Sequence, residues 1–260
     1  MTAPGGLAAC AGLVERGDPD RFRAAMAAPL AARARLIPLY ALNLELARAP
    51  WASAEPMLAE MRLQWWRDAL DEIGQGATPR GHEVLAPAAE VIRAAGIPVA
   101  LFDAMAEARR WDIWREPFAG EAALWDHLDA TAGNLMWAAA LALEAPMGAE
   151  PAVRRFARGA GLAAWLRAVP ALAARGRHPL PDPGDAGALA RAGLADIAAA
   201  RAARATVPRR AVPALWAGWQ ARAILAQAAA EPGRVAAGTL GLSEFAQRGG
   251  LLWRAFAGRW

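Results

Sequence analysis

Residues 161–181 read GLAAWLRAVPALAARGRHPLP and form the most informative stretch of this chain. Apolar residues recur along its first half with helical spacing, and Gly176, Pro179 and Pro181 then mark a turn. The same pattern extends back to residue 151. Between residues 151 and 181 there are six arginines and one histidine, but no aspartate or glutamate. The charged side chains of this predicted helix and turn are therefore all basic.

The composition of the whole chain favours an all-α fold in a single domain covering residues 1–260. The 260 residues are 56% hydrophobic, much of this is alanine, and β-branched residues are scarce. All basic residues are arginine, the net charge is +4, and the pI is about 10.6. This charge suits an anionic partner such as a diphosphate or an acidic membrane. We expect no nucleic-acid partner, because the arginines follow helices and are not grouped with aromatic residues on strands.

Capping and breaking residues divide the chain into eight to ten expected helices. Asp18 is an expected N-cap with Pro19 at the first helical position. Pro29 and Pro38 should interrupt or kink the next segment, and Gly133 should mark a bend or a close helix contact. The expected helices cover residues 19–28, 55–73, 84–95, 98–111, 121–144, 151–174, 185–205, 208–230 and 243–259.

Several features bear on where the protein acts. The single cysteine, Cys10, excludes an internal disulfide, and no signal sequence is evident. The longest uncharged runs, such as residues 130–143, are too short to span a bilayer. Near the C-terminus, arginines alternate with three aromatic residues that are candidate membrane contacts, Trp253, Phe256 and Trp260. The other interpretation is a C-terminal helix packed on the domain. We therefore expect a cytoplasmic protein, or one bound peripherally to the inner membrane.

Two acid pairs have a spacing that could hold Mg²⁺, namely Asp68 with Asp71 and Asp126 with Asp129. Residues three apart lie on one face of a helix, so the carboxylates of each pair could be neighbours. The simpler interpretation is that both pairs belong to solvated helix faces. The three histidines are far apart and show no metal-ligand spacing.

Four segments together match a known pattern of conserved residues. They are DRFRAAMAAPLAARARLIPLYAL, MRLQWWRDALDEI, LWDHLDATAGNLMWAAA and the opening stretch. The matching residues are Phe22, Arg35, Tyr40, Ala41, Arg62, Trp65, Trp66, Arg67, Ala132, Gly133, Leu162, Leu166, Arg167, Val169, Gly176, Arg177, Leu180 and Pro181. With these landmarks the chain resembles the squalene/phytoene synthase family over about residues 18–195. The resemblance implies an isoprenoid synthase-like, all-α, single-domain bundle around a central cavity.

The same resemblance shows what the chain lacks. Active members of the family join two prenyl diphosphates and hold Mg²⁺ with two facing aspartate-rich motifs. In the second motif, the positions of the amide and acid ligands are Ala164, Ala168, Ala171 and Leu172. Near the first motif the chain has Leu46, Ala47, Arg48 and Trp51, and Glu45 is the only carboxylate close by. We therefore expect no catalytic residue, no metal ligand and no cofactor.

One non-catalytic branch is especially similar, the phytoene-synthase-like assembly factor of mitochondrial respiratory complex I. The resemblance implies that the partners are complex I subunits or assembly intermediates, with an isoprenoid or acidic lipid as a further ligand. Candidate anion-binding residues of the cavity are Arg35, Tyr40, Arg62, Arg67, Arg167 and Arg177. Two alternatives stay open. One is an active prenyltransferase that uses Mg²⁺ with Asp68, Asp71, Asp126 or Asp129 as relocated ligands. The other is a carrier for an isoprenoid or quinone tail.

Overall fold

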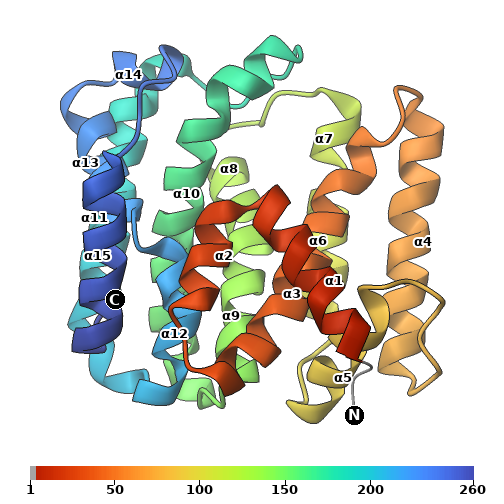
Figure 1. The fold of residues 1–260 in the computed structure, drawn as a ribbon. Helices are drawn as coiled ribbons and strands as arrows, with labels where there is room; N and C mark the ends of the chain where they lie inside the picture. Colours follow the sequence, from red (N-terminus) through yellow and green to blue (C-terminus); the bar gives the residue numbers. More distant parts are fainter. Residues whose placement is uncertain (1–3) are drawn as a thin grey trace.

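The computed structural model describes residues 4–260, apart from the side chains of residues 4, 5, 244, 245, 247 and 248. Throughout these residues the regular elements are helices, and no strand occurs. The longest helix, α10 (Glu150–Ala174), crosses the middle of the bundle and is packed on both sides by other helices (Figure 1). The predicted all-α fold class is confirmed.

The remaining elements follow in chain order. The α-helices are α1 (Pro4–Gly17), α2 (Pro19–Met26), α3 (Leu30–Arg48), α4 (Pro56–Gly74), α5 (Leu85–Ala94), α6 (Ala100–Ala108), α7 (Trp111–Trp114), α8 (Glu121–Leu128), α9 (Asn134–Ala142), α11 (Ala186–Ala202), α12 (Val212–Leu215), α13 (Ala221–Ala230), α14 (Gly233–Ala236) and α15 (Glu244–Ala257). The shorter helical turns are η1 (Ala49–Trp51), η2 (Asp129–Gly133), η3 (Met147–Ala149), η4 (Pro183–Asp185), η5 (Arg204–Thr206), η6 (Arg209–Ala211) and η7 (Trp216–Gly218).

Pro29 separates α2 from α3, as expected, but the interruption considered at Pro38 does not occur, because α3 continues through it. The proline removes one backbone donor and the helix keeps its other bonds. The segment expected as one helix over residues 208–230 is instead divided into α12, η7 and α13. A Cβ on Gly218 would lie 2.7 Å from the Cβ of Ala160. The chain thus passes directly over α10 at this glycine, and the tight passage accompanies the break.

The contact between α10 and α11 is equally close. A Cβ on Gly159 would lie 2.8 Å from the carbonyl oxygen of Gly193 and 2.6 Å from Cγ1 of Ile197. Real Cβ atoms do not come this close to a backbone oxygen, so α10 needs glycine at residue 159 where it crosses α11. This crossing holds α10 in position between α9 and the helices α11 and α13.

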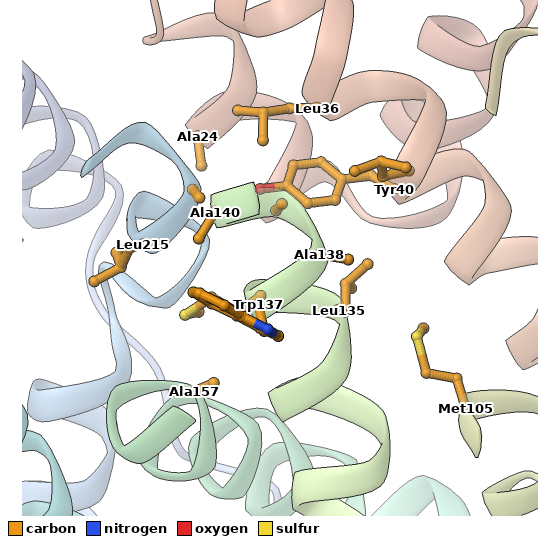
Figure 2. Packing of buried hydrophobic residues seen from close by; sticks show 14 of the residues in the cluster. Ala24, Leu36, Tyr40, Met105, Leu135, Trp137, Ala138, Ala140, Ala157 and Leu215 are labelled. Atoms are coloured by element: carbon orange, nitrogen blue, oxygen red, sulfur yellow. The ribbon is translucent and has the colours of Figure 1, made fainter. Parts of the chain in front are cut away.

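Buried side chains from distant parts of the sequence fill the interior. Figure 2 shows Trp137 of α9 among alanines of α9 and α10 and Leu215 of α12. Tyr40 and Leu36 of α3 lie above it and are almost fully buried. Helix α1 packs on α3 and places Cys10 in the interior, where burial raises the pKa of its thiol to about 11. In residues 4–260, no helix has both the length and the apolar character that crossing a bilayer requires.

Candidate functional site

A cavity of about 460 Å³ lies between α3, α10 and the segment from α8 to α9. It is lined mainly by apolar and small side chains, with a few polar groups from α2, α3 and the end of α6. The residues that line it include Asp18, Arg21, Tyr40, Asn43, Ala47, Trp51, Arg109, Asp112, Thr131, Ala132, Leu135, Met136, Ala160, Gly161, Ala164, Trp165, Ala168, Ala171, Leu172 and Arg175. Its volume lies within the range of small-molecule sites.

Small residues on one face of α10 make the cavity wide. Ala160, Gly161, Ala164, Ala168 and Ala171 recur at helical spacing and all line it. A Cβ on Gly161 would lie only 2.6 Å from the Cβ of Ala132, so α10 and the segment that faces it are in close contact at this point of the cavity wall. A face of alanines leaves room for an apolar ligand and provides no polar partner for one.

The opposite segment contains a π-helical turn, η2, between α8 and α9. The expected helix over residues 121–144 is therefore helical without a break from Glu121 to Ala142, and Gly133 ends the π-helical turn within it. Thr131 and Ala132 line the cavity from this turn, and the Thr131 hydroxyl donates to the carbonyl of His127 at 2.6 Å. Such turns often occur at functional sites, because the extra residue changes which side chains face inward.

The positions at which the family resemblance places metal ligands meet in this cavity. Ala47 and Trp51 line it from the end of α3 and η1, and Ala164, Ala168 and Leu172 line it from α10. The two segments that resemble the family's motifs therefore face the same cavity, although their side chains at these positions are not acids. Leu46, also considered near the first motif, is fully buried elsewhere.

The other two residues considered near the first motif point away from the cavity. Arg48 and Glu45 pair with each other at 3.6 Å and line a separate groove beside α4. The one carboxylate close to the first motif is thus outside the cavity.

The two carboxylates that do line the cavity have other partners. Asp18 caps α2 by accepting from the amide of Arg21 at 2.9 Å, and it also pairs with the Arg21 guanidinium. Asp112 is 3.6 Å from Arg109 and almost fully buried, and burial raises the pKa of its carboxyl group.

Mg²⁺ needs several oxygen ligands in octahedral arrangement. In the described part of the chain, no three His, Cys, Asp or Glu side chains are grouped closely enough to hold a metal ion. The residues of this cavity therefore do not fit the magnesium cluster that the family resemblance implies.

An aromatic cluster packs around Trp165 of the α10 wall. Trp165 contacts the rings of Trp111, Phe118 and His127, with ring centroids 5.0–5.8 Å away. Its indole Nε1 donates to the carbonyl of Pro179 at 2.7 Å, which fixes the turn after α10. Burial lowers the pKa of His127 to about 3, so its imidazole is neutral at physiological pH and contributes no charge to the site.

Tyr40 is the one predicted ligand-binding residue that lines the cavity. It is 1% exposed, its hydroxyl has no hydrogen-bond partner, and burial raises its pKa. The guanidinium of Arg21 lies 5.4 Å from the ring centroid. Asn43, one helical turn further along α3, also lines the cavity. Sequence reasoning missed Asn43, although its spacing from Tyr40 indicates a shared helix face.

The predicted arginines do not gather in the cavity, which differs from the expectation. Arg35 bonds to the carbonyl of Ala142 at 2.8 Å, and Arg62 is exposed on α4. Arg67 pairs with Asp103 at 2.6 Å and also with Glu107. Arg167 lies on the outer face of α10 and pairs with Asp20 at 2.9 Å. Arg35, Arg67 and Arg167 instead hold neighbouring segments together, and Arg62 lines the groove beside α4.

Arg177 is buried beside the cavity, at its mouth. Its guanidinium carbon and that of Arg175 lie 4.9 Å and 4.8 Å from the ring centroid of Trp51. Trp51 and Arg175 line the cavity, whereas Arg177 lines a groove next to it. Cation–π contacts of this kind hold Trp51 near the position where the family pattern has a metal ligand.

The candidate membrane contacts separate into two groups. Trp253 and Phe256 of α15 are 63% and 89% exposed. Trp260 instead packs its ring against Phe156 of α10, with centroids 4.8 Å apart. Only the first two residues are therefore available for a contact outside the domain.

Comparison with known proteins identifies the fold. The family model described as squalene/phytoene synthase matches residues 14–183. No curated protein sequence matches the chain. A dehydrosqualene synthase solved in complex with ligand superposes with a TM-score of 0.81 at 14% identity, covering 97% of this chain and 95% of that one. Squalene synthase HpnC from Alicyclobacillus acidocaldarius gives 0.71 at 15% identity, covering 86% and 93%. The isoprenoid synthase-like fold is confirmed.

Proposed function

Because this chain belongs to the squalene/phytoene synthase family, we propose that it is a member that binds ligands or partners without joining prenyl diphosphates. The observation that supports the proposal is the composition of the two facing walls. Ala47, Trp51, Ala168 and Leu172 line the cavity at positions where the resemblance places acids. Neutral side chains of this kind cannot hold the divalent ions that such a reaction uses to neutralise diphosphates.

The alternative of an active enzyme with relocated ligands finds no support in the positions of its four candidate acids. Asp68 and Asp71 accept hydrogen bonds on the outside of α4, from Gln64 and Gln75. Asp129 pairs with Arg154 at 3.0 Å, and Asp126 is exposed on α8. None of the four lines the cavity.

The decisive test is an assay for release of inorganic diphosphate. The purified protein is incubated with Mg²⁺ and either farnesyl or geranylgeranyl diphosphate, and an active dehydrosqualene synthase serves as a positive control. We expect no release above the rate without protein. Release that depends on this protein and stops when EDTA is added would show that the proposal is wrong.

As the cellular role we propose assistance in the assembly of respiratory complex I, at the cytoplasmic face of the inner membrane. The support is the resemblance of the α3, α4 and α10 segments to the assembly-factor branch. The partners would be complex I subunits or assembly intermediates. Deleting the gene in its own organism should lower complex I activity, and the intact gene should restore it. Unchanged complex I activity in the deletion strain would refute this role.

A second candidate function is carriage of an isoprenoid or quinone tail, and the shape of the cavity favours it. Leu135, Met136 and Leu172 join the alanine face of α10 to give an apolar lining of small-molecule size. Mass spectrometry of the purified protein should detect a retained apolar molecule. The substitution Ala164→Leu should displace it by filling the cavity, and Ala173→Leu, an exposed position outside the lining, should not.

We also propose that α15 mediates peripheral membrane attachment. Trp253 and Phe256 project from the helix, Arg254 lies between them in the sequence, and Arg259 follows. Aromatic side chains insert at the boundary of an anionic bilayer while arginines attract its headgroups. An acidic lipid is the expected membrane ligand.

A further inference from the structure

A second groove lies beside the cavity mouth and is positively charged. It measures about 580 Å³, and the residues that matter here are Trp51, Ser53, Pro56, Arg115, Arg175 and Arg177. No aspartate or glutamate lines it. Pro56 is the first residue of α4, so the positive end of a 19-residue helix also borders the groove. The local charge is therefore concentrated and not balanced within the groove.

Arg177 is the most unusual of the three arginines, because it is only 8% exposed. Its Nη2 donates to the backbone carbonyl of Asp112, whereas Nε and Nη1 are buried and have no hydrogen-bond partner. Buried guanidinium donors are nearly always satisfied, since an unpaired one loses its hydration without compensation. Burial lowers the pKa of Arg177, and the neighbouring charge of Arg115 lowers it further.

The nearby acids compensate this charge only in part, although the carboxylate of Asp112 attracts the Arg177 guanidinium. Asp112 faces Arg109 at 3.6 Å, and Glu60 accepts from Arg110 at 3.0 Å and from Trp114. Across the part of the chain that the structure describes, none of the ion pairs includes Arg115, Arg175 or Arg177. The groove therefore combines three cations with donors that lack an acceptor.

The backbone after α10 and the indole of Trp51 set the geometry of this cluster. Gly176 has a φ of 72°, a left-handed conformation that lets the chain turn sharply between Arg175 and Arg177. Both guanidinium groups then lie within 5 Å of the same indole ring. An arginine stacked on an aromatic ring keeps its edge N–H groups free to donate to an oxyanion.

We propose that this groove binds a phosphate or diphosphate group directly, without a metal ion. Arginine recognises phosphate oxygens through paired N–H donors, and three arginines would neutralise such an anion. The site is distinct from the apolar cavity, although Trp51 and Arg175 border both. Anion binding by this groove does not depend on the proposed lack of catalysis, because the binding is measured in the absence of metal and of prenyl substrate.

Titration calorimetry with inorganic pyrophosphate in EDTA tests the proposal. The key variant is Arg115→Gln/Arg175→Gln, because both side chains are exposed and their loss leaves the core intact. The matched control is Arg155→Gln, an exposed arginine of α10 outside the groove. We expect binding by the wild-type protein and the control, and roughly tenfold or greater weakening in the double variant. Thermal unfolding of all three proteins verifies that they are folded.

A second arm separates a free anion from a lipid headgroup. Flotation is measured with phosphatidylcholine vesicles that contain or lack phosphatidic acid. Binding of pyrophosphate, or of the acidic vesicles alone, supports the site if the double variant loses it, and the pattern identifies the source of the phosphate. The proposal is overturned if neither probe binds, if binding requires Mg²⁺, or if the double variant binds as tightly as the wild-type protein.

Discussion

The crossing of α10 and α11 gives a prediction whose size follows from the structure. In Gly159→Ala, the new Cβ would lie 2.8 Å from the carbonyl oxygen of Gly193 and 2.6 Å from Cγ1 of Ile197. Overlap in a packed core costs about 1–3 kcal/mol, and overlap with rigid backbone belongs at the upper end. Alanine regains about 1 kcal/mol of helix propensity. We therefore expect the variant to be less stable by about 2 kcal/mol.

For a domain of this size, such a loss lowers Tm by about 4–8 °C. Thermal unfolding followed by circular dichroism measures it. The matched control is Gly148→Ala, because a Cβ at Gly148 meets nothing within 4 Å, and its Tm should stay within about 2 °C of the wild-type value. A Gly159→Ala protein that is as stable as the wild type would show that the two helices are not held in the close contact described above.

Three further predictions concern the site and the C-terminus. His127 has a folded pKa of about 3 against 6.5 in the unfolded chain. Its contribution to stability is thus complete above pH 6.5 and falls by about 1.4 kcal/mol per pH unit as the pH drops towards 3. Urea unfolding at pH 5 and pH 7 should show a shallower pH dependence for His127→Asn, and equal dependence would contradict the assignment. The double variant Trp253→Ala/Phe256→Ala should lose flotation with anionic vesicles, whereas Met147→Ala, 67% exposed elsewhere, should retain it. Flotation equal to wild type would exclude α15 as the anchor. Trp165→Phe removes a buried hydrogen bond to a backbone carbonyl and should lower the free energy of unfolding by about 1–2 kcal/mol, which denaturant titration measures. An unchanged midpoint would mean that this bond adds nothing to stability.

Much of the cavity wall could be predicted from the sequence because it follows helical spacing. Ala164, Ala168 and Ala171 lie on one face of a single long helix, so locating one of them locates the others. Tyr40 shares a face of α3 with Ala47 for the same reason. Helix periodicity and landmark residues were sufficient for these positions.

The arginines could not be placed in the same way. Arg167 is adjacent in sequence to Ala168, but one residue turns the side chain by about 100° around the helix, and Arg167 therefore faces Asp20 outside the cavity. Arg67 belongs to α4, at the edge of the bundle (Figure 1), where it pairs with Asp103. Which acid meets each arginine depends on how distant helices pack, and local sequence does not contain that information.

The division of residues 208–230 was missed for a related reason. Gly218 appears in the sequence as one small residue among many, and only its contact with Ala160 shows that the chain must pass close to α10. The local pattern favours helix, and tertiary packing overrides it at this position.

The contact of Arg175 and Arg177 with the indole of Trp51 has a consequence for any attempt to build a metal site in this cavity. Suppose that aspartates were introduced at residues 47, 51, 168 and 172. Removing Trp51 would release the two guanidinium groups that now stack on it, and they would lie next to the new carboxylates. Arginine–carboxylate pairing would then compete with metal coordination for the same oxygens. Adding the acids alone would therefore produce ion pairs, and the arginines would have to be replaced as well.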